Sequence, residues 1–199
     1  EPDAVSPSMA DAEIICGLRA GKSCAWAALY DRYSGPIWQY VAKLVGSQQA
    51  IVSDLVQETM LAAARSAAGF DDSRGTLWQW LTGIAHHQVS GHWRKEKQVT
   101  RLRQLVTSNS GDGFSRAQPP SDISPSAGME QRETAELVRA ALARLPPDYA
   151  SILIAKYVDE QSLAEIQDQW NATSDSVRSR MVRARQLFRE VFERLTQTP

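Results

Sequence analysis

Five arginines close together near the C-terminus are the residues whose type and spacing point most directly to a chemical role. They lie between residues 174 and 189, where Asp175 is the single acidic residue. Guanidinium groups form paired hydrogen bonds with phosphate oxygens and with guanine edges. The segment therefore predicts a surface that binds anions, and nucleic acid in particular. The five are Arg178, Arg180, Arg183, Arg185 and Arg189.

Hydrophobic periodicity predicts a helix that turns these arginines outward. Val177, Met181, Ala184, Phe188 and Val191 recur at spacings of four and three residues, which places them on one buried stripe. The first turn presents backbone amides and the positive end of the helix dipole. A solvated helix with an arginine-rich exterior is the alternative interpretation. The candidate DNA contacts are Ser174, Ser176, Arg178, Ser179, Arg180, Arg183 and Arg185.

A shorter helix is predicted just before this one. The run Ser162-Leu163-Ala164-Glu165 fits a capping box, in which the Ser and Glu side chains satisfy backbone amides at a helix start. The helix ends near Trp170, and a turn at 171–173 leads to a cap at Ser174 or Asp175. Two short helices separated by such a turn are typical of the helix-turn-helix motif, whose second helix lies in the DNA major groove.

The remaining sequence also has helical periodicity and no alternating strand pattern. Residues 107–128 are rich in Ser, Gly, Pro and Asp, which is typical of a flexible linker. We therefore predict an all-α fold with two small helical domains, 10–97 and 130–197, joined by a flexible linker over 98–129. Further helices are expected over 11–19, from Ser23, from Pro36 to Gly46, over 48–65, from Thr76 to Lys97, over 130–145, and from Asp148 to Tyr157.

Composition excludes several classes of protein. The 199 residues carry a net charge of −1, and two cysteines cannot form a disulfide framework. No apolar run is long enough to span a membrane, and the first ten residues lack the order of a signal peptide, so we expect a soluble, cytoplasmic protein. Without a Gly-rich phosphate loop or a nucleophile elbow, we expect neither an enzyme nor a cofactor. The five-residue spacing of His87 and His92 argues against a metal site.

Sequence runs on both sides of the linker resemble one known family. The C-terminal runs are similar to the promoter-reading domain of bacterial sigma-70 family sigma factors of the extracytoplasmic-function (ECF) group. They are Leu145-Pro146-Pro147-Asp148-Tyr149, Ser162 to Ile166, Ser176 to Arg180, and Arg183-Ala184-Arg185. The N-terminal runs are similar to the domain of the same family that binds core polymerase and reads the −10 element. They are Leu29 to Tyr33, Asp54 to Glu58, Phe70-Asp71, Arg74-Gly75, and Trp80 to Ala85.

The resemblance implies a function and its partners. The helix with Asp54, Leu55, Gln57 and Glu58 would bind bacterial core RNA polymerase, and the arginine-rich helix would read the −35 promoter element as duplex. The turn from Phe70 and the helix after it would read and melt the −10 element and bind its non-template single strand. An anti-sigma partner is also implied. The −10 candidates are Phe70, Arg74, Trp78, His87, Trp93, Arg94, Lys95 and Lys97.

Base extrusion costs a few kcal/mol, which stacking, a pocket and cationic contacts offset. We expect Trp80 to be in the core and Trp78, two positions away, to face outward. The helix departs from the family pattern, because Ala85-His86-His87 and Gly91 stand where members commonly have Ala-Arg-Asn and an Asp. The selectivity for the −10 element is therefore expected to be unusual or weak, or to depend on His86, His87 or His92.

Two other functions stay open at this point. The first is a helix-turn-helix transcriptional regulator that binds palindromic duplex DNA as a dimer. The second is a degenerate sigma-like interaction module that binds polymerase or a regulator without reading DNA. Transcription from a purified template distinguishes all three.

Overall fold

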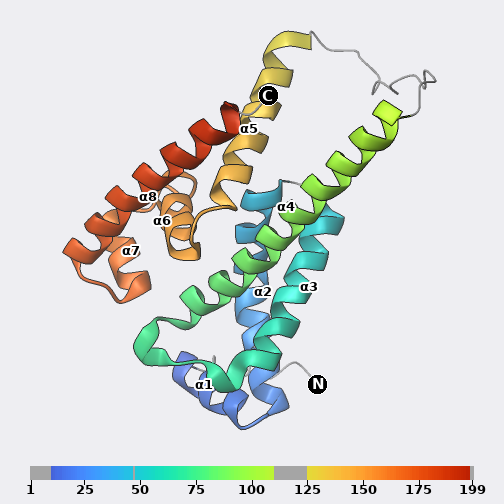
Figure 1. The fold of residues 1–199 in the computed structure, drawn as a ribbon. Helices are drawn as coiled ribbons and strands as arrows, with labels where there is room; N and C mark the ends of the chain where they lie inside the picture. The colour runs from blue at the N-terminus through green and yellow to red at the C-terminus, as the bar shows by residue number, and fades with distance from the viewer. Residues whose placement is uncertain (1–9, 47, 110–124, 198–199) are drawn as a thin grey trace.

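The computed structural model describes residues 10–46, 48–109 and 125–197, without the side chains of 101, 103–109 and 125–128. This part of the chain forms eight α-helices and two short 3-10 turns, with no strand, which confirms the all-α prediction (Figure 1). The helices are α1 (Asp11–Arg19), α2 (Ser23–Val45), α3 (Gln49–Ser66), α4 (Leu77–Asn109), α5 (Pro125–Leu142), α6 (Pro147–Tyr157), α7 (Leu163–Trp170) and α8 (Ser174–Thr196), and the 3-10 turns are Ala67–Gly69 and Asp72–Arg74.

Helices α1 to α4 form an N-terminal body, in which α2, α3 and α4 pack against one another. The expected break between two helices near Pro36 is wrong, because Pro36 lies inside the continuous helix α2. Proline removes one helical hydrogen bond, but Tyr33, Ile37 and Tyr40 form a continuous buried face on both sides of it. Their packing keeps the helix intact. The body's most buried side chains include Ile14, Leu29, Ile37, Leu44, Leu77 and Leu81.

Helices α5 to α8 form a C-terminal body with its own buried residues. The Ser162 hydroxyl accepts a hydrogen bond from the Glu165 amide at 3.2 Å, and the Ser162 amide donates to Glu165 Oε2 at 2.7 Å. The predicted capping box is therefore confirmed. Asn171 is the C-cap residue of α7, and its backbone adopts the left-handed helical conformation. Helix α6 starts at Pro147 rather than at a cap on Asp148, because the two prolines preset the backbone of its first turn.

Two helix boundaries lie within the segment that the sequence assigned to the linker. Helix α4 continues past Lys97 to Asn109, and α5 begins at Pro125 rather than at Glu130. No Gly or Pro stands between 92 and 109, so nothing in the sequence stops α4 there. The rest of the predicted linker, 110–124, lies outside the described residues.

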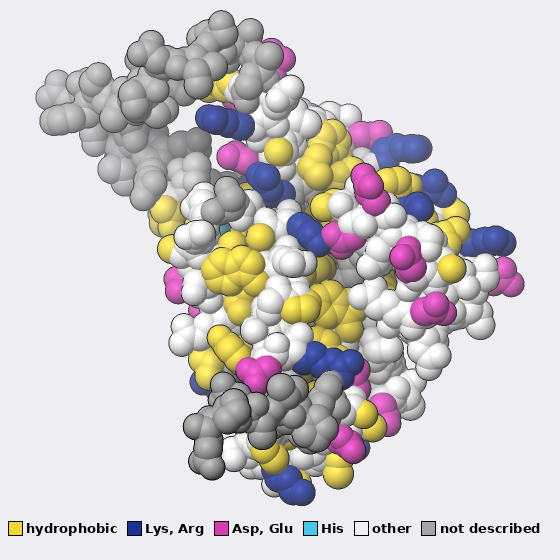
Figure 2. Space-filling view, turned by 180° about the vertical axis from the view of Figure 1, so that it is seen from behind, with side chains coloured by type: hydrophobic (Ala, Val, Ile, Leu, Met, Phe, Trp, Pro, Cys, Tyr) yellow, Lys and Arg dark blue, Asp and Glu magenta, His cyan; other side chains and the backbone are white. Residues whose placement is uncertain are grey.

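The surface of the molecule is uneven in character. Seen from behind the view of Figure 1, hydrophobic side chains gather in the middle of one face, and Lys and Arg side chains project at the right edge, on the side of α8 (Figure 2). In the described part of the chain, no helix combines the length and the apolar character that a membrane span requires.

Candidate nucleic-acid interface

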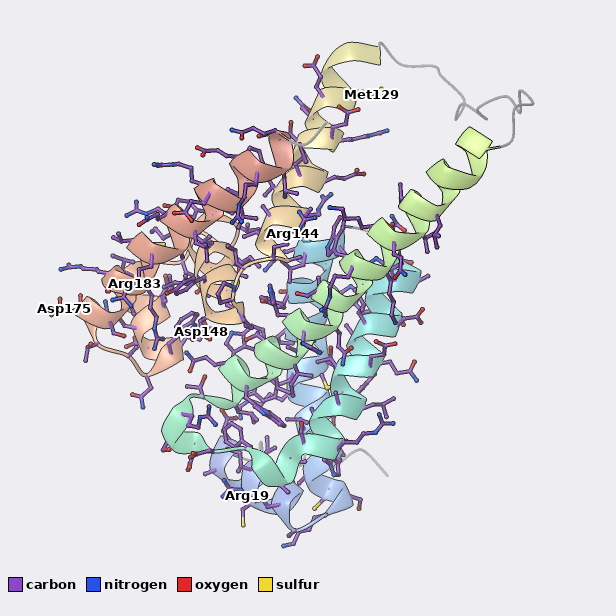
Figure 3. The ribbon with its side chains drawn as sticks, viewed as in Figure 1. Arg19, Met129, Arg144, Asp148, Asp175 and Arg183 are labelled. Atoms are coloured by element: carbon purple, nitrogen blue, oxygen red, sulfur yellow. The ribbon has the colours of Figure 1, made fainter. Side chains whose placement is uncertain are left out.

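Helix α8 presents its arginines as the sequence predicts. Val177, Met181, Ala184 and Val191 are buried, whereas Arg178, Ser179, Arg183 and Arg185 are exposed. Asp175 lies at the N-terminal end of α8, with Arg183 farther along the helix (Figure 3). None of the arginines from 178 to 185 forms an ion pair with another residue that the structure describes. These guanidinium groups are therefore available to an external anion.

The first turn of α8 is capped by the residue before the predicted cap. The Thr173 hydroxyl accepts a hydrogen bond from the Ser176 amide at 3.4 Å, so the expected cap at Ser174 or Asp175 is wrong by one or two positions. Ser174 and Ser176 are partly buried in this turn. Their backbone amides remain at the positive end of the helix dipole, where phosphate oxygens bind.

Arg180 is held differently from the other arginines. Its guanidinium carbon lies 5.7 Å from the ring centroid of Trp170, which is 4% exposed. Cation–π contact with a buried indole restricts the arginine side chain. In the sequence, Trp170 only marks the end of the shorter helix. Its contact with Arg180 was not predicted, because a periodicity within α7 does not report what the ring contacts on α8.

The turn before α4 is fixed by polar contacts from both of its sides. Asp71 accepts hydrogen bonds from the Ser73 amide at 3.0 Å and the Ser73 hydroxyl at 2.7 Å, and the hydroxyl bond, followed by the amide bond, lowers the pKa of Asp71. Thr76 and Gln79 cap the start of α4. Gly75 has a φ of 155°, which L side chains rarely adopt, and an added Cβ atom would lie 2.8 Å from Gln79 Oε1, so a side chain here would displace the Gln79 cap. Arg74 is exposed on the turn.

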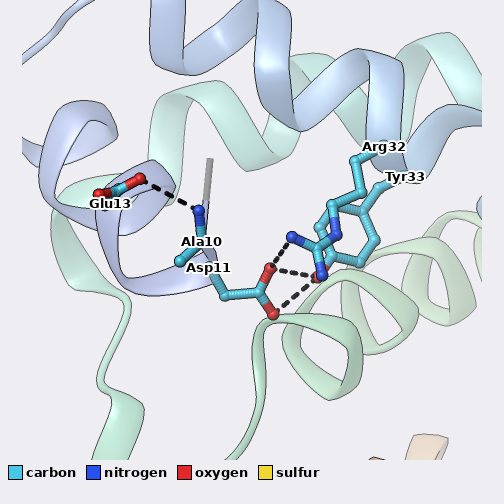
Figure 4. Close-up of polar contacts among 5 residues, drawn as sticks. All are labelled: Ala10, Asp11, Glu13, Arg32 and Tyr33. Atoms are coloured by element: carbon cyan, nitrogen blue, oxygen red, sulfur yellow. Dashed lines mark hydrogen bonds and ion pairs between the residues drawn. The ribbon is translucent and has the colours of Figure 1, made fainter. Parts of the chain in front are cut away.

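Helix α1 also holds the turn that precedes α4. Arg19 donates a hydrogen bond of 2.6 Å to the carbonyl oxygen of Phe70. Asp11 joins α1 to α2, because its carboxylate accepts from the Tyr33 hydroxyl at 2.9 Å and pairs with Arg32 at 3.1 Å (Figure 4). Burial, and then the bond to Asp11, raise the pKa of Tyr33. The turn is thus held by α1, which is held by α2.

The aromatic residues near the turn lie differently from the prediction. Phe70 is 5% exposed and contacts Trp80 edge-on at 5.2 Å, so Phe70 is a core residue in this conformation. Trp78 does not face outward, because its ring packs between Tyr33 and Tyr40 of α2, at 6.4 and 6.3 Å. Trp80, expected in the core, is only partly buried.

A hollow between α3 and α4 lies beside Trp80. It has a volume of about 540 Å³, with Trp80 and Ile84 as its large apolar side chains and a cation, two amides and an imidazole as its polar groups. His87, a predicted DNA contact, is exposed at this hollow. Arg65 and Gln88 also line it but were not among the predicted contacts, because neither stands in a recognisable motif. The polar lining residues are Arg65, Ser66, Gln79, His87 and Gln88.

The basic stretch of α4 is partly exposed. Arg94, Lys95 and Lys97 are exposed, whereas Trp93 is partly buried and its indole N–H donates to the Leu44 carbonyl at 3.2 Å. Trp93 therefore joins α4 to the end of α2 rather than projecting toward a ligand. His86, one position from His87, is 2% exposed.

A second surface lies on α3, away from the arginines. Of the four predicted polymerase contacts, Asp54, Gln57 and Glu58 are exposed, whereas Leu55 is 6% exposed and belongs to the core. Gln57 borders a groove of about 900 Å³ between α2 and α3. Leu61 is 48% exposed in this groove. The large hydrophobic residues that line this groove include Trp26, Tyr30, Trp38, Met60 and Leu61, none of which was predicted as a contact.

Comparison with known protein families decides the chain's family. Residues 29–99 match the model of sigma-70 region 2, and residues 128–188 match the model of sigma-70 region 4. The chain belongs to the ECF group of the sigma-70 family. Region 2 covers most of α2, all of α3 and most of α4, and region 4 covers most of α5 to α8.

Curated sigma-70 relatives align with most of the chain. The ECF RNA polymerase sigma factor SigL of Mycobacterium tuberculosis is 25% identical over 84% of this chain and 88% of its own length. SigW of Bacillus subtilis is 25% identical over 87% of this chain and 91% of its own. The solved structure of CnrH in complex with the cytosolic domain of CnrY has a TM-score of 0.47 and 18% identity, over 92% of this chain and 97% of that one.

Proposed function

We propose that this chain is an ECF sigma factor that directs bacterial core RNA polymerase to specific promoters and starts transcription there. The observation that carries the proposal is the surface of α8, the second helix of a capped helix-turn-helix. Arginines lie on this surface and form no ion pair with an acidic residue that the structure describes. A dimeric regulator would use the same helix, but the matches to both sigma-70 regions favour the sigma factor.

The −35 element is assigned to α8. Arg178, Arg180, Arg183 and Arg185 supply forked donors for phosphates and for guanine O6 and N7, and the first turn supplies backbone amides. Trp170 positions Arg180, which makes this arginine the strongest candidate for a base contact.

The −10 element is assigned to the fixed turn and to α4. Arg74, His87, Arg94, Lys95 and Lys97 are exposed there and contact the separated strand. The hollow beside Trp80 offers a ring for stacking and amides for a base edge, which together favour an extruded base over a stacked one. Phe70, Trp78 and Trp93 support these elements from within rather than contacting DNA in this conformation.

Core polymerase is assigned to the groove between α2 and α3. Asp54, Gln57 and Glu58 orient the complex and speed association, as charged rims do, and the apolar lining supplies the buried area. SigL and SigW are named as RNA polymerase sigma factors. By the same likeness we propose cytoplasmic action without catalysis by the chain itself, under the control of an anti-sigma factor.

Run-off transcription with purified core enzyme and a promoter library tests the proposal. We expect transcripts from a subset of templates that share two elements at fixed spacing. Binding to palindromic duplex DNA as a dimer, with no transcription from any template, would contradict the proposal and favour a regulator.

A further inference from the structure

The end of helix α5 needs hydrogen-bond donors that its own sequence does not supply. A helical carbonyl normally accepts from the amide four residues later, and for Ala143 that residue is Pro147, which has no amide hydrogen. The N-terminal body supplies donors instead. The Ser90 hydroxyl donates to the Ala143 carbonyl at 2.7 Å, and His86 Nε2 lies 2.8 Å from the Leu145 carbonyl.

The other side of the His86 ring continues the connection. Because Nε2 donates to a carbonyl, Nδ1 is the acceptor of the neutral ring, and the Tyr40 hydroxyl lies 3.4 Å from it. Ser151 of α6 donates to the Tyr40 oxygen at 3.1 Å. Tyr40, His86 and Ser151 are at most 9% exposed. Burial lowers the pKa of His86, which favours the neutral form that this chain of bonds requires.

Two further contacts lie at the rim. Lys43 of α2 forms an ion pair with Asp159, which follows α6. The Arg139 guanidinium of α5 packs over Gly46, where an added Cβ would lie 3.5 Å from its central carbon. The contacts between the two bodies thus include several polar groups, and water can replace these donors when the bodies separate.

The packed arrangement is too small for the proposed function. A compact chain of this length has a radius of gyration of about 16 Å and a diameter of about 40 Å. Promoter elements centred 25 base pairs apart are separated by about 85 Å along the duplex. The two DNA-reading helices therefore cannot bind both elements while the bodies remain packed.

We propose that this packing is an autoinhibited state, closed by His86 and Ser90 of α4 on the end of α5, and that it must open before polymerase and promoter are bound together. The inference rests on the proposed function. It also gives the His86 departure from the family pattern a role, because the residue binds the C-terminal body rather than DNA.

Charge reversal at the rim tests the inference without altering the core of either body. Lys43→Glu places two acids together, and the double variant Lys43→Glu/Asp159→Lys restores an ion pair of opposite polarity. His86→Glu replaces the donor to the Leu145 carbonyl with a carboxylate, which that carbonyl oxygen repels. Circular dichroism checks that each full-length variant keeps its helix content.

Two measurements are made on each variant: the radius of gyration by small-angle X-ray scattering, and the affinity for core polymerase. We expect Lys43→Glu and His86→Glu to expand the chain and to strengthen polymerase binding, by about tenfold for His86→Glu, since the closed population no longer competes. The double variant returns both values toward those of the wild type.

The outcomes separate the inference from the proposed function. If the variants expand but bind polymerase no more tightly than the wild type, or if they do not expand, the autoinhibition is overturned while the sigma-factor function stands. If neither the wild type nor any expanded variant binds polymerase, the proposed function fails and the autoinhibition fails with it.

Discussion

Arg180 and Arg178 occupy one recognition surface but are held unequally. The Trp170 ring restricts Arg180, whereas Arg178 is exposed. We expect Arg180→Ala to weaken binding of the holoenzyme to a cognate −35 element by about 1 to 3 kcal/mol, the usual worth of a bidentate base contact. Arg180→Lys should recover little, because an ammonium does not reproduce the fork.

Fluorescence anisotropy with labelled promoter duplexes measures this effect. Changing each base pair of the −35 element in turn, and comparing the affinities of the variant and the wild type, separates base reading from phosphate binding. Loss of a base contact relaxes selectivity at one position only. Equal affinity of Arg180→Ala and the wild type for the cognate sequence would remove Arg180 from the recognition surface.

His86 predicts a pH dependence of the closed packing. Burial lowers its pKa below the ordinary 6.5, the bond to Leu145 opposes this, and nearby His87 adds to it. Between the lowered value and 6.5, the open chain binds more protons than the closed one, so the packing is stable above pH 6.5 and weakens as pH falls below it. Tyr40 lies beside the ring, Asp148 acts electrostatically on Tyr40, and the Lys43–Asp159 ion pair lies at the rim of the same packing.

Scattering at several pH values measures the expansion. The wild type should expand below pH 6.5, and His86→Gln should expand much less over the same range. His87→Gln is the matched control, because His87 is exposed, and it should behave as the wild type does. The same expansion in His86→Gln as in the wild type would assign the effect to another group.

At the residue scale, sequence predicted the exposed arginines of α8 but not the partners of the buried polar residues. His86 stood out because it breaks the family pattern, yet its contacts with Leu145 and Tyr40 join segments far apart in the chain. The same reason explains Trp78, whose neighbours are supplied by α2. Local spacing reports which face a residue shares and not which element covers it.

The capping box of α7 sets the start of the helix-turn-helix. We expect Ser162→Ala to lower the free energy of unfolding by about 1 kcal/mol, because the Glu165 amide loses its acceptor. Urea denaturation followed by circular dichroism measures the change. Ser53→Ala, on an exposed position of α3, is the control and should not destabilise the chain.

The groove between α2 and α3 predicts a separable effect on polymerase. We expect Leu61→Glu to weaken the association with core enzyme at least tenfold, because a carboxylate enters an apolar contact, while the helix content stays unchanged. Gln57→Ala should have a smaller effect. Co-migration with core polymerase on a sizing column compares them, and full co-migration of Leu61→Glu would exclude this groove as the contact.

Element boundaries followed from sequence where a specific cap or breaker was present. Ser162 with Glu165 marked one helix start correctly and Thr76 another, and in the structure Gln79 completes the cap at Thr76. The helix start predicted at Pro36 was wrong. Proline is common in the first turn of a helix, but here the packing of α2 keeps the helix continuous through it. The end of α4 was missed because composition suggested a linker sooner than any breaker occurred.

At the scale of the whole molecule, sequence predicted the two helical bodies but not their packing. The bodies are specified by periodic stripes within each helix, whereas the packing depends on single groups, such as Ser90 and Ser151, that no pattern distinguishes. Deleting these two hydroxyls in Ser90→Ala/Ser151→Ala should raise the radius of gyration measurably while each body keeps its helix content. An unchanged scattering profile would show that the hydroxyls do not hold the packing.

Because α4 is continuous to Asn109, the direction in which the chain leaves this helix depends on how many residues the helix contains. Each residue inserted between 98 and 109 would turn the direction in which the chain leaves the helix by about 100° and advance it by about 1.5 Å. Seven extra residues in α4 nearly restore the original direction, whereas two extra residues turn it to the opposite side of the helix. We therefore expect transcription from a promoter of fixed spacing to tolerate seven inserted residues better than two.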